Sequence, residues 1–334
     1  MKLTIKDIAR MAEVSTATVS MILNNKDGNI STETREKVLK IVKENNYILN
    51  TMARSLVTRQ TKTIGLVLPD IANPFFPELA RGAEDKASEA GYSIIFCNTD
   101  DDLGKEEKYI NMLAEKMVDG IVFTHSAKRA GGVSPIDRAD IPVILIDRDF
   151  DSSNVKGKVL VDNLEGAYKA VRHLISRGYK KIAFITGALT SNTAKDRHAG
   201  YRKALEDSGI KYDKSYVRAG QYKSEWGLTA AKQLLDEGLD FDAVFCGNDL
   251  IAISVIKLLK SKGYSIPKDI GIVGFDDIYM ASVVEPGLTT VKQPNYEMGY
   301  KAVELLIDVL EKSGKAAEPR TIILDTELII RSST

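Results

Sequence analysis

Cysteine and histidine are both scarce in this chain, with two cysteines and three histidines among 334 residues. Cys97 and Cys246 lie in apolar runs typical of separate strands, so we expect buried free thiols rather than a disulfide or a metal site. The histidines, His125, His173 and His198, lack the spacing of metal ligands. The sequence therefore argues against a metalloprotein or a disulfide-stabilised domain, and we expect no cofactor.

Long apolar runs and enzyme motifs are also missing. No apolar segment follows Met1 and none is long enough to span a bilayer, so we expect a cytoplasmic, nucleoid-associated protein with no membrane partner. The sequence has no GxGxxG after a strand, no P-loop, no GxSxG and no set of histidines and carboxylates that would bind a metal. Nothing in it indicates an enzyme.

The charge is zero overall but unevenly distributed along the chain. Residues 1–60 carry ten Lys and Arg against six Asp and Glu, whereas the remainder carries 36 against 40. A basic first part on an acidic body suggests a polyanion partner for the first part alone, although an excess of four is modest. The length allows two or three domains of ordinary globular composition.

A helix-turn-helix pattern begins the chain. Thr4 and Asp7 form a capping box, and apolar residues follow Ile5 at i+3, i+4 and i+7, which indicates one helical face. Ser15 is a good N-cap for a second helix whose outward residues are small or slender and include no acid. Ser31 caps a third helix. This pattern predicts a helix that enters the DNA major groove, although any small helical hairpin shares it.

Residues 50–56 are helix-compatible but too short to be stable alone. A polar linker follows at 58–63, and Ala53 and Leu56 would share one helical face. We interpret the segment as a hinge helix that orders only on meeting its partner, with a frayed linker as the alternative.

From Ile64 onward, short apolar runs alternate with amphipathic segments, which is the rhythm of βαβ units. The rhythm restarts after 159–161, so we predict two lobes, each a doubly wound parallel sheet. Strands are expected at 64–68, 93–96, 120–123, 142–146, 159–161, 181–186, 242–246 and 270–274, and helices from 74, 104, 163, 197, 224 and 249. Ligands bind such sheets at the carboxyl ends of the strands, so the cleft between the lobes is the expected site.

Polar and aromatic residues gather at these strand ends. Individually, each is more often a cap, a turn or a surface pair. Together they favour a polar small-molecule site, and they are Asp70, the run 73–76, Asp147, Arg148, Asn192, Thr193, Arg197, Tyr222, Asn248, Asp249, Asp276 and Asp277.

These features together closely resemble the LacI/GalR family of bacterial transcriptional regulators, over nearly the whole chain. The matching motifs are TIKDIA, VSTATVS, STETREKV and ARSL at the front, and TIGLVLPDIANPFF, IPVILIDR, GND, VGFDD and LTTVKQP in the body. The resemblance implies an N-terminal all-α helix-turn-helix domain at 1–49, a hinge helix and linker at 50–62, and an α/β two-lobed body like the periplasmic binding proteins at 63–334. The first lobe would comprise about 63–161 and 293–324, and the second about 162–292 and 325–334. A last long helix, 295–310, would return to the first lobe, and a strand would follow at 327–330.

By the same resemblance, palindromic operator DNA is the partner of the first domain. Thr16, Ala17 and Met21 would face the bases, and Leu56 would wedge into the minor groove and kink the DNA. Methionine cannot make a bidentate contact to guanine, so we expect this face to read partly through apolar contact and DNA shape. The DNA-binding set is Thr4, Ser15, Thr16, Ala17, Thr18, Met21, Asn24, Tyr47, Asn50, Ala53 and Leu56.

The resemblance also implies an effector pocket, formed by Phe75, Thr124, Arg148, Asn192, Arg197, Tyr222, Asn248 and Asp276, with His125 and Gln293 as further candidates. Aromatic faces beside carboxylates and guanidinium groups suit a sugar or a sugar phosphate, and a purine base is the alternative. We expect a homodimeric repressor of carbohydrate-related genes under allosteric control. The sequence leaves open whether a protein co-regulator is needed, as it is for some members of the family. The rival functions are a solute-binding protein and an α/β enzyme working in the cleft.

Overall fold

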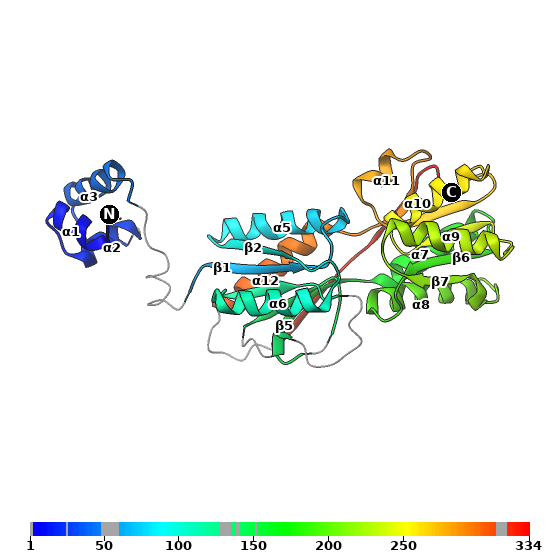
Figure 1. Ribbon diagram of the computed structural model, residues 1–334, viewed down its shortest axis with the longest axis horizontal. Helices are drawn as coiled ribbons and strands as arrows, with labels where there is room; N and C mark the ends of the chain where they lie inside the picture. The colour runs from blue at the N-terminus through cyan, green and yellow to red at the C-terminus, as the bar shows by residue number, and fades with distance from the viewer. Residues whose placement is uncertain are drawn as a thin grey trace. The chain divides into compact units, whose positions relative to one another are not determined.

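The computed structural model describes residues 3–24, 26–47, 60–126, 135–137, 141–150, 152–311 and 319–334 (Figure 1). The chain divides into two compact units, Met1–Thr61 and Lys62–Thr334, which are described separately. The predicted hinge residues Asn50, Ala53 and Leu56 lie outside the described residues. Among the residues that are described, no helix is both long and apolar enough to cross a membrane.

The first unit is a bundle of three helices, α1 (Ile5–Ala12), α2 (Thr16–Leu23) and α3 (Thr32–Glu44). Thr4 and Asp7 form the predicted capping box, and Ser15 and Ser31 cap α2 and α3 through their side-chain oxygens. The turn between α1 and α2 requires a left-handed backbone at Glu13, with φ 57°. The shared core consists of Ile8, Ala9, Ala12, Val19, Ile22 and Val38.

The second unit contains two six-stranded sheets, and each belongs to one lobe. The first sheet has the order β11-β5-β4-β3-β1-β2 and is parallel throughout. Its strands are β1 (Thr63–Leu68), β2 (Ser93–Asn98), β3 (Gly120–Phe123), β4 (Val143–Ile146), β5 (Val155–Val161) and β11 (Arg320–Leu324).

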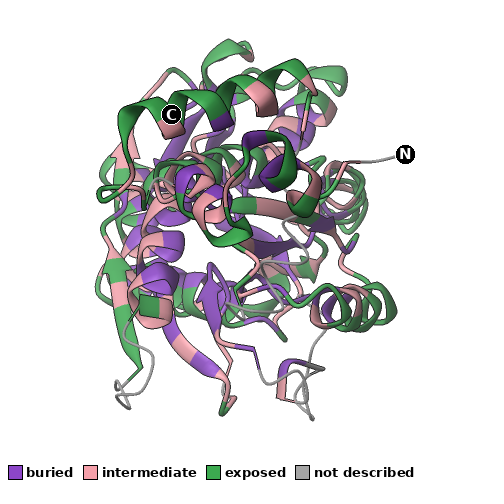
Figure 2. Ribbon diagram, turned by 90° about the vertical axis from the view of Figure 1, so that its left-hand side faces the viewer, coloured by how far each residue is buried: buried purple, intermediate pink, exposed green. Residues whose placement is uncertain are grey.

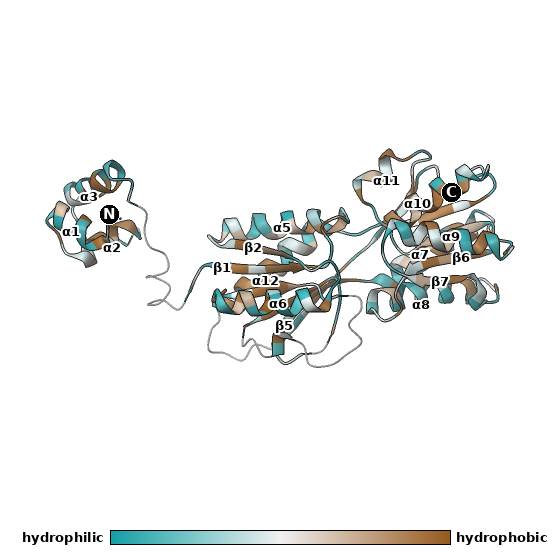
Figure 3. Cartoon of the chain, in the orientation of Figure 1, coloured by the Kyte–Doolittle hydropathy of each residue, from teal (hydrophilic) through white to brown (hydrophobic). Residues whose placement is uncertain are grey.

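Helices cover both faces of this sheet, which explains why its strands are continuous apolar runs. Along β1, Leu66 packs in the same core as α5 (Phe75–Glu89) and α12 (Asn295–Glu311), whereas its neighbour Val67 packs on the other side with α6 (Leu103–Glu115). Figure 3 shows the strands as predominantly hydrophobic, and Figure 2 shows them as largely buried between more exposed helices. A short 3-10 helix, Pro135–Asp137, also belongs to this lobe.

The second sheet has the order β12-β10-β9-β8-β6-β7. Its strands are β6 (Ile182–Gly187), β7 (Val217–Gly220), β8 (Ala243–Cys246), β9 (Gly271–Asp276), β10 (Thr289–Lys292) and β12 (Glu327–Ile329). On one face lie α7 (Asn163–Ser176) and α8 (Asn192–Glu206), and on the other lie α9 (Ser224–Asp236) and α10 (Asp249–Ser261). The remaining helices are α11 (Tyr279–Val283) and a 3-10 turn at Lys214–Tyr216.

The structure confirms the two-lobed α/β body and corrects the sequence analysis in several places. The second sheet is not wholly parallel, because β12 runs antiparallel to β10. Helix α8 begins at Asn192, five residues before the predicted start at Arg197, because the Ser191 hydroxyl caps it. The strands β7, β10 and β11 and helix α11 were missed, since they are short or half-exposed and lack a clear apolar period.

The last long helix, α12, packs on α5 of the first lobe at very close range. A Cβ built on Gly299 would lie 1.9 Å from the carbonyl oxygen of Leu79, and one built on Gly82 would lie 1.9 Å from that of Tyr296. Glycine at both positions therefore permits backbone-to-backbone contact between the two helices.

Candidate functional site

A cavity of about 140 Å³ lies between the lobes, where the carboxyl ends of both sets of strands meet. Such strand ends are where doubly wound sheets bind ligands. The lining residues are Pro69, Asp70, Asn73, Phe75, Phe76, Asp100, Asp101, Asp147 and Arg148 from the first lobe, and Thr193, Arg197, Gln221, Tyr222, Lys223, Asn248, Asp276 and Gln293 from the segments of the second lobe and its connection. Six of the eight predicted effector residues, and the further candidate Gln293, line it.

Arg197 lies at the base of this pocket on α8 and is 4% exposed. Its Nε donates to Asn163 Oδ1 at 2.8 Å, and its Nη1 donates to the carbonyl oxygen of Gly247 at 2.5 Å. The guanidinium carbon also lies 3.7 Å from the centre of the Phe275 ring. The first residue of α7, a loop carbonyl and a core aromatic ring thus fix the orientation of Arg197 before any ligand binds.

Two aromatic residues wall the pocket from opposite lobes. Phe75 opens α5 and packs edge-on against Phe76, with ring centres 4.9 Å apart. The Tyr222 ring lies against Gly187, where an added Cβ would approach to 2.3 Å, so glycine is required there. The Tyr222 Oη is buried and has no hydrogen-bond partner among the described residues.

Asn248 both caps a helix and lines the pocket. Its Oδ1 accepts from the backbone N of Ile251 at 3.0 Å at the start of α10, and its Nδ2 donates to the Tyr222 carbonyl oxygen at 3.4 Å. From the sequence, a helix cap and a ligand-binding role were alternative interpretations of such a residue. In the structure Asn248 caps α10 and also lines the pocket.

Asp276 ends β9 beside a second buried carboxyl, Asp249. Burial raises the pKa of Asp276 to about 7, while Arg197 and a hydrogen bond from Gln293 oppose that rise. Gln293 Nε2 donates to Asp276 Oδ1 at 2.7 Å. Burial also raises the pKa of Asp249, which accepts a hydrogen bond from Thr290 Oγ1 at 2.5 Å. Asp249 and Asp276 therefore form a buried acidic pair on the second-lobe side of the pocket. Thr290 and Gln293 donate hydrogen bonds to them, and the Arg197 guanidinium lies near Asp276.

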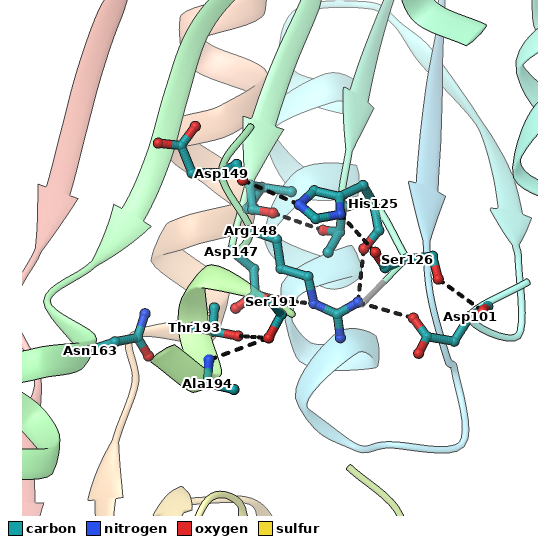
Figure 4. A network of polar contacts seen from close by, with 12 residues as sticks. Asp101, His125, Ser126, Asp147, Arg148, Asp149, Asn163, Ser191, Thr193 and Ala194 are labelled. Atoms are coloured by element: carbon teal, nitrogen blue, oxygen red, sulfur yellow. Dashed lines mark hydrogen bonds and ion pairs between the residues drawn. The ribbon is translucent and has the colours of Figure 1, made fainter. Parts of the chain in front are cut away.

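Arg148 follows β4 and is held from several directions (Figure 4). Its Nη1 donates to Asp101 Oδ1 at 3.0 Å and to the carbonyl oxygen of His125 at 2.8 Å. Its Nε lies 3.6 Å from Asp147 Oδ2. Burial raises the pKa of Asp147, against the opposing charges of Arg148 and Arg197. Two carboxylates of its own lobe therefore balance the Arg148 charge.

Two predicted effector residues and one further candidate do not line the cavity. The buried Thr124 hydroxyl donates to the carbonyl oxygen of Ile146 at 3.0 Å and so ties β3 to β4. Asn192 Nδ2 donates to the carbonyl oxygen of Asp149 at 2.9 Å, a contact from the second lobe to the first. The His125 ring is buried, with Nδ1 2.8 Å from the carbonyl oxygen of Ser126.

Two of the carboxylates and one cation of the pocket lining were not predicted from the sequence, and Asp70 and Asp147 were named only as strand-end residues. Asp100, Asp101 and Lys223 were not considered, and Asn163 was missed as the partner of Arg197. Asp100, Asp101, Asp147 and Asp276 all have positive φ, at 52°, 58°, 67° and 115°. Aspartate tolerates the left-handed region better than most residues, and a run of aspartates directly after an apolar strand is the signal that could have found them.

In the first unit, α2 presents an uncharged outward face. Ser15, Thr16 and Ala17 are exposed, and Met21 is 41% exposed. The hydroxyl of Ser15 accepts from the backbone N of Thr18 at 3.0 Å. The other predicted contacts also serve the bundle: Thr4 caps α1, Asn24 Nδ2 donates to the carbonyl oxygen of Ser20 at 2.6 Å, and Tyr47 packs at the edge of the core.

A helix-turn-helix unit followed by a two-lobed body with a polar cleft defines a DNA-binding regulator that carries its own ligand-binding domain. Residues 4–50 match the model described as bacterial regulatory proteins, lacI family, and residues 61–332 match the model described as periplasmic binding proteins and sugar binding domain of LacI family. The chain belongs to the LacI family and is a transcriptional repressor of that family.

Named relatives span the whole chain. The HTH-type transcriptional regulator RegA of Clostridium saccharobutylicum is 41% identical and covers 100% of both chains. The HTH-type transcriptional repressor PurR of Vibrio atlanticus (strain LGP32) is 38% identical and covers 99% of this chain and 98% of its own. These relatives are named as regulators, which removes the solute-binding and enzyme alternatives.

Solved structures agree with this fold. The lac repressor dimer bound to operator and the anti-inducer ONPF has a TM-score of 0.86 at 26% identity, covering 100% of this chain and 99% of that one. A LacI family regulator from Enterococcus faecium with bound ribose has a TM-score of 0.72 at 30% identity, covering 81% of this chain and 98% of that one.

Proposed function

We propose that the chain is a homodimeric repressor of carbohydrate-related genes, which binds a palindromic operator under the control of a small sugar in the interlobe pocket. The observation that carries the proposal is the pocket itself. It combines two aromatic walls with buried polar atoms that have no hydrogen-bond partner among the described residues, namely Tyr222 Oη, Gln293 Oε1 and Arg148 Nε.

Such atoms suit the hydroxyls of a sugar. A buried polar group without a partner costs about 1–3 kcal/mol, so a ligand that supplies partners gains affinity. Hydroxyls both donate and accept, and the apolar face of a sugar ring can stack on Phe75 or Tyr222. The volume of about 140 Å³ is below the roughly 300–1,000 Å³ of pockets for drug-sized ligands, which favours a monosaccharide over a larger ligand.

A purine base is the second candidate. It would stack on the same two rings, and relatives named HTH-type transcriptional repressor PurR are similar to this chain over nearly its whole length. We favour the sugar because the lining is rich in carboxylates, and because a LacI family neighbour was solved with ribose.

We propose that α2 reads the operator through Thr16, Ala17 and Met21, with Ser15 and Thr18 contacting the DNA backbone. The exposed side chains at the first three positions carry no charge, so they offer no bidentate donor to guanine. Contact with thymine methyl groups, together with DNA shape, would then supply the specificity.

Exposed apolar residues support assembly with a second copy. Within the described residues, Tyr279 is 77% exposed and Val283 is 55% exposed on α11, and Phe96 is 42% exposed on the edge strand β2. We propose that these surfaces pack against a second copy, since the lac repressor neighbour was solved as a dimer on its operator. The Tyr279→Asp variant should sediment as a monomer, whereas Leu228→Asp, at an exposed apolar residue on α9, should remain a dimer.

The function is tested by fluorescence anisotropy on operator DNA selected from a random pool, with and without a panel of sugars and purines. Salt is held fixed because affinity depends steeply on it. The proposal expects tight binding to a palindrome and a change in that binding on addition of one sugar. If only purines change it, the sugar assignment is wrong. If ligands bind the body but leave the operator complex unchanged, the allosteric control is wrong.

A further inference from the structure

The effector pocket is lined by more carboxyl groups than cationic groups. Its lining holds five carboxyl groups and three cationic groups, and one of the carboxylates, Asp100, also pairs with Lys105 from outside the lining. The carboxylates are Asp70, Asp100, Asp101, Asp147 and Asp276, and the cations are Arg148, Arg197 and Lys223. An anionic ligand would therefore enter a site whose lining has no excess of positive charge, even when the buried Asp147 and Asp276 are protonated.

The two buried cations are also committed to protein partners. Arg148 donates to Asp101 and lies beside Asp147, as described above. Arg197 donates to Asn163 and Gly247, and its Nη1 lies 3.9 Å from Asp276. A phosphate bound by either arginine would lie close to the carboxyl group that already faces that arginine.

The hydrogen-bonding character of the lining leads to the same conclusion. Carboxylate oxygens and the unpartnered Gln293 Oε1 are acceptors, so they require a ligand that donates. A phosphate ester carries a charge of about −1.5 to −2 near pH 7 and offers mainly acceptors. A neutral sugar offers a hydroxyl donor at nearly every carbon.

This inference rests on the proposed sugar effector. We propose that Asp101, by pairing with Arg148, makes the pocket select unphosphorylated sugars over their phosphate esters. Asp101 is the residue to change because it is only partly buried, with 25% of its side chain exposed, whereas Asp147 and Asp276 are nearly fully buried. When the charge of Asp101 is removed, Arg148 keeps Asp147 as an ion-pair partner and can then pair with an anionic ligand.

The Asp101→Asn variant isolates this charge. Asparagine has the same shape and tolerates the left-handed backbone at this position, where φ is 58°. The Ser126 hydroxyl donates to the backbone oxygen of Asp101 and not to its side chain, so that contact is kept. The matched control is Asp240→Asn, which removes a carboxylate from an exposed ion pair with Lys181, away from the pocket lining.

The experiment measures binding to the full chain by calorimetry, using neutral pentoses and hexoses and the 5- or 6-phosphate of each. Wild type should bind at least one neutral sugar, and its phosphate at least about tenfold more weakly. Asp101→Asn should raise the affinity for the phosphate about tenfold relative to the neutral sugar, and Asp240→Asn should leave the ratio unchanged. In a parallel melting experiment, millimolar inorganic phosphate should stabilise Asp101→Asn more than wild type, against chloride at equal ionic strength.

Two results would overturn the selection by Asp101 while leaving the sugar effector intact. One is equal or tighter binding of a phosphate ester by wild type, and the other is an unchanged ratio in Asp101→Asn. If no sugar of either kind binds, the sugar effector itself is wrong and this inference is wrong with it.

Discussion

The Asp276→Asn variant should change how the stability of the body depends on pH. Burial raises the pKa of Asp276 from 3.8 to about 7 in the folded chain. Between those two values the folded state holds a proton that the unfolded state has lost. The free energy of unfolding that Asp276 contributes is therefore largest below pH 3.8. It decreases as the pH rises, until the carboxyl of the folded chain ionises near pH 7.

The size of the effect follows from the shift. Each rise of one pH unit in this window lowers the free energy of unfolding by about 1.4 kcal/mol. Between pH 5.5 and pH 7 it therefore falls by about 2 kcal/mol. At about 2 °C per kcal/mol for a large domain, the melting temperature of wild type should fall by about 4 °C from this source. Asparagine cannot ionise, and its Oδ1 can still accept the hydrogen bond from Gln293.

The assay is thermal melting of both chains at closely spaced pH values from 5.5 to 8. The difference in melting temperature, variant minus wild type, should grow by about 4 °C between pH 5.5 and 7 and then stay level. Asp240→Asn, at an exposed carboxylate, should show no such growth. A difference that stays constant across the range would refute the titration of Asp276 in this window.

Three further predictions concern packing, a cap and the orientation of the site. Gly299→Ala should destabilise the body by about 3 kcal/mol or more in urea melts, because its Cβ would meet the Leu79 carbonyl oxygen at 1.9 Å, whereas Gly104→Ala in α6 should be neutral or slightly stabilising. Thr4→Ala should destabilise the first unit by about 1 kcal/mol through loss of the α1 cap, measured by helical circular dichroism. Asn163→Ala leaves Arg197 Nε without its acceptor and should weaken effector binding about tenfold while Asn163→Asp largely restores it; equal loss in both would contradict the hydrogen-bonding role.

The sequence was sufficient where one local rule decides the structure. The capping box at Thr4 and Asp7 and the serine caps were predicted correctly, because a cap depends only on residues within one turn. Most strand positions were also predicted, since strands buried on both faces are continuous apolar runs. The start of α8 was wrong by five residues because the signal, Ser191, stands in a polar turn that has no apolar period.

The sequence was insufficient where a property belongs to a pair of distant residues. Arg148 was correctly expected at a strand end and lines the pocket, but its pairing with Asp101 joins residues 47 apart in the chain. Likewise Asn163 orients Arg197 across 34 residues. Thr124 and Asn192 have polar side chains like those of the pocket residues. Only the structure shows that these side chains donate to backbone carbonyl oxygens instead of lining the pocket.

The arrangement of the pocket explains how a small ligand could control the body. Its walls come from both lobes, with Phe75 and Arg148 on one side and Arg197 and Tyr222 on the other. A ligand that contacts both walls makes all its contacts in only one relative arrangement of the lobes, and its differential affinity shifts the population toward that arrangement. Asn192 already donates to Asp149 across the same cleft, so an effector would add to an existing interlobe contact. Because the two arrangements need differ by only a few kcal/mol, a handful of hydroxyl contacts is enough to choose between them.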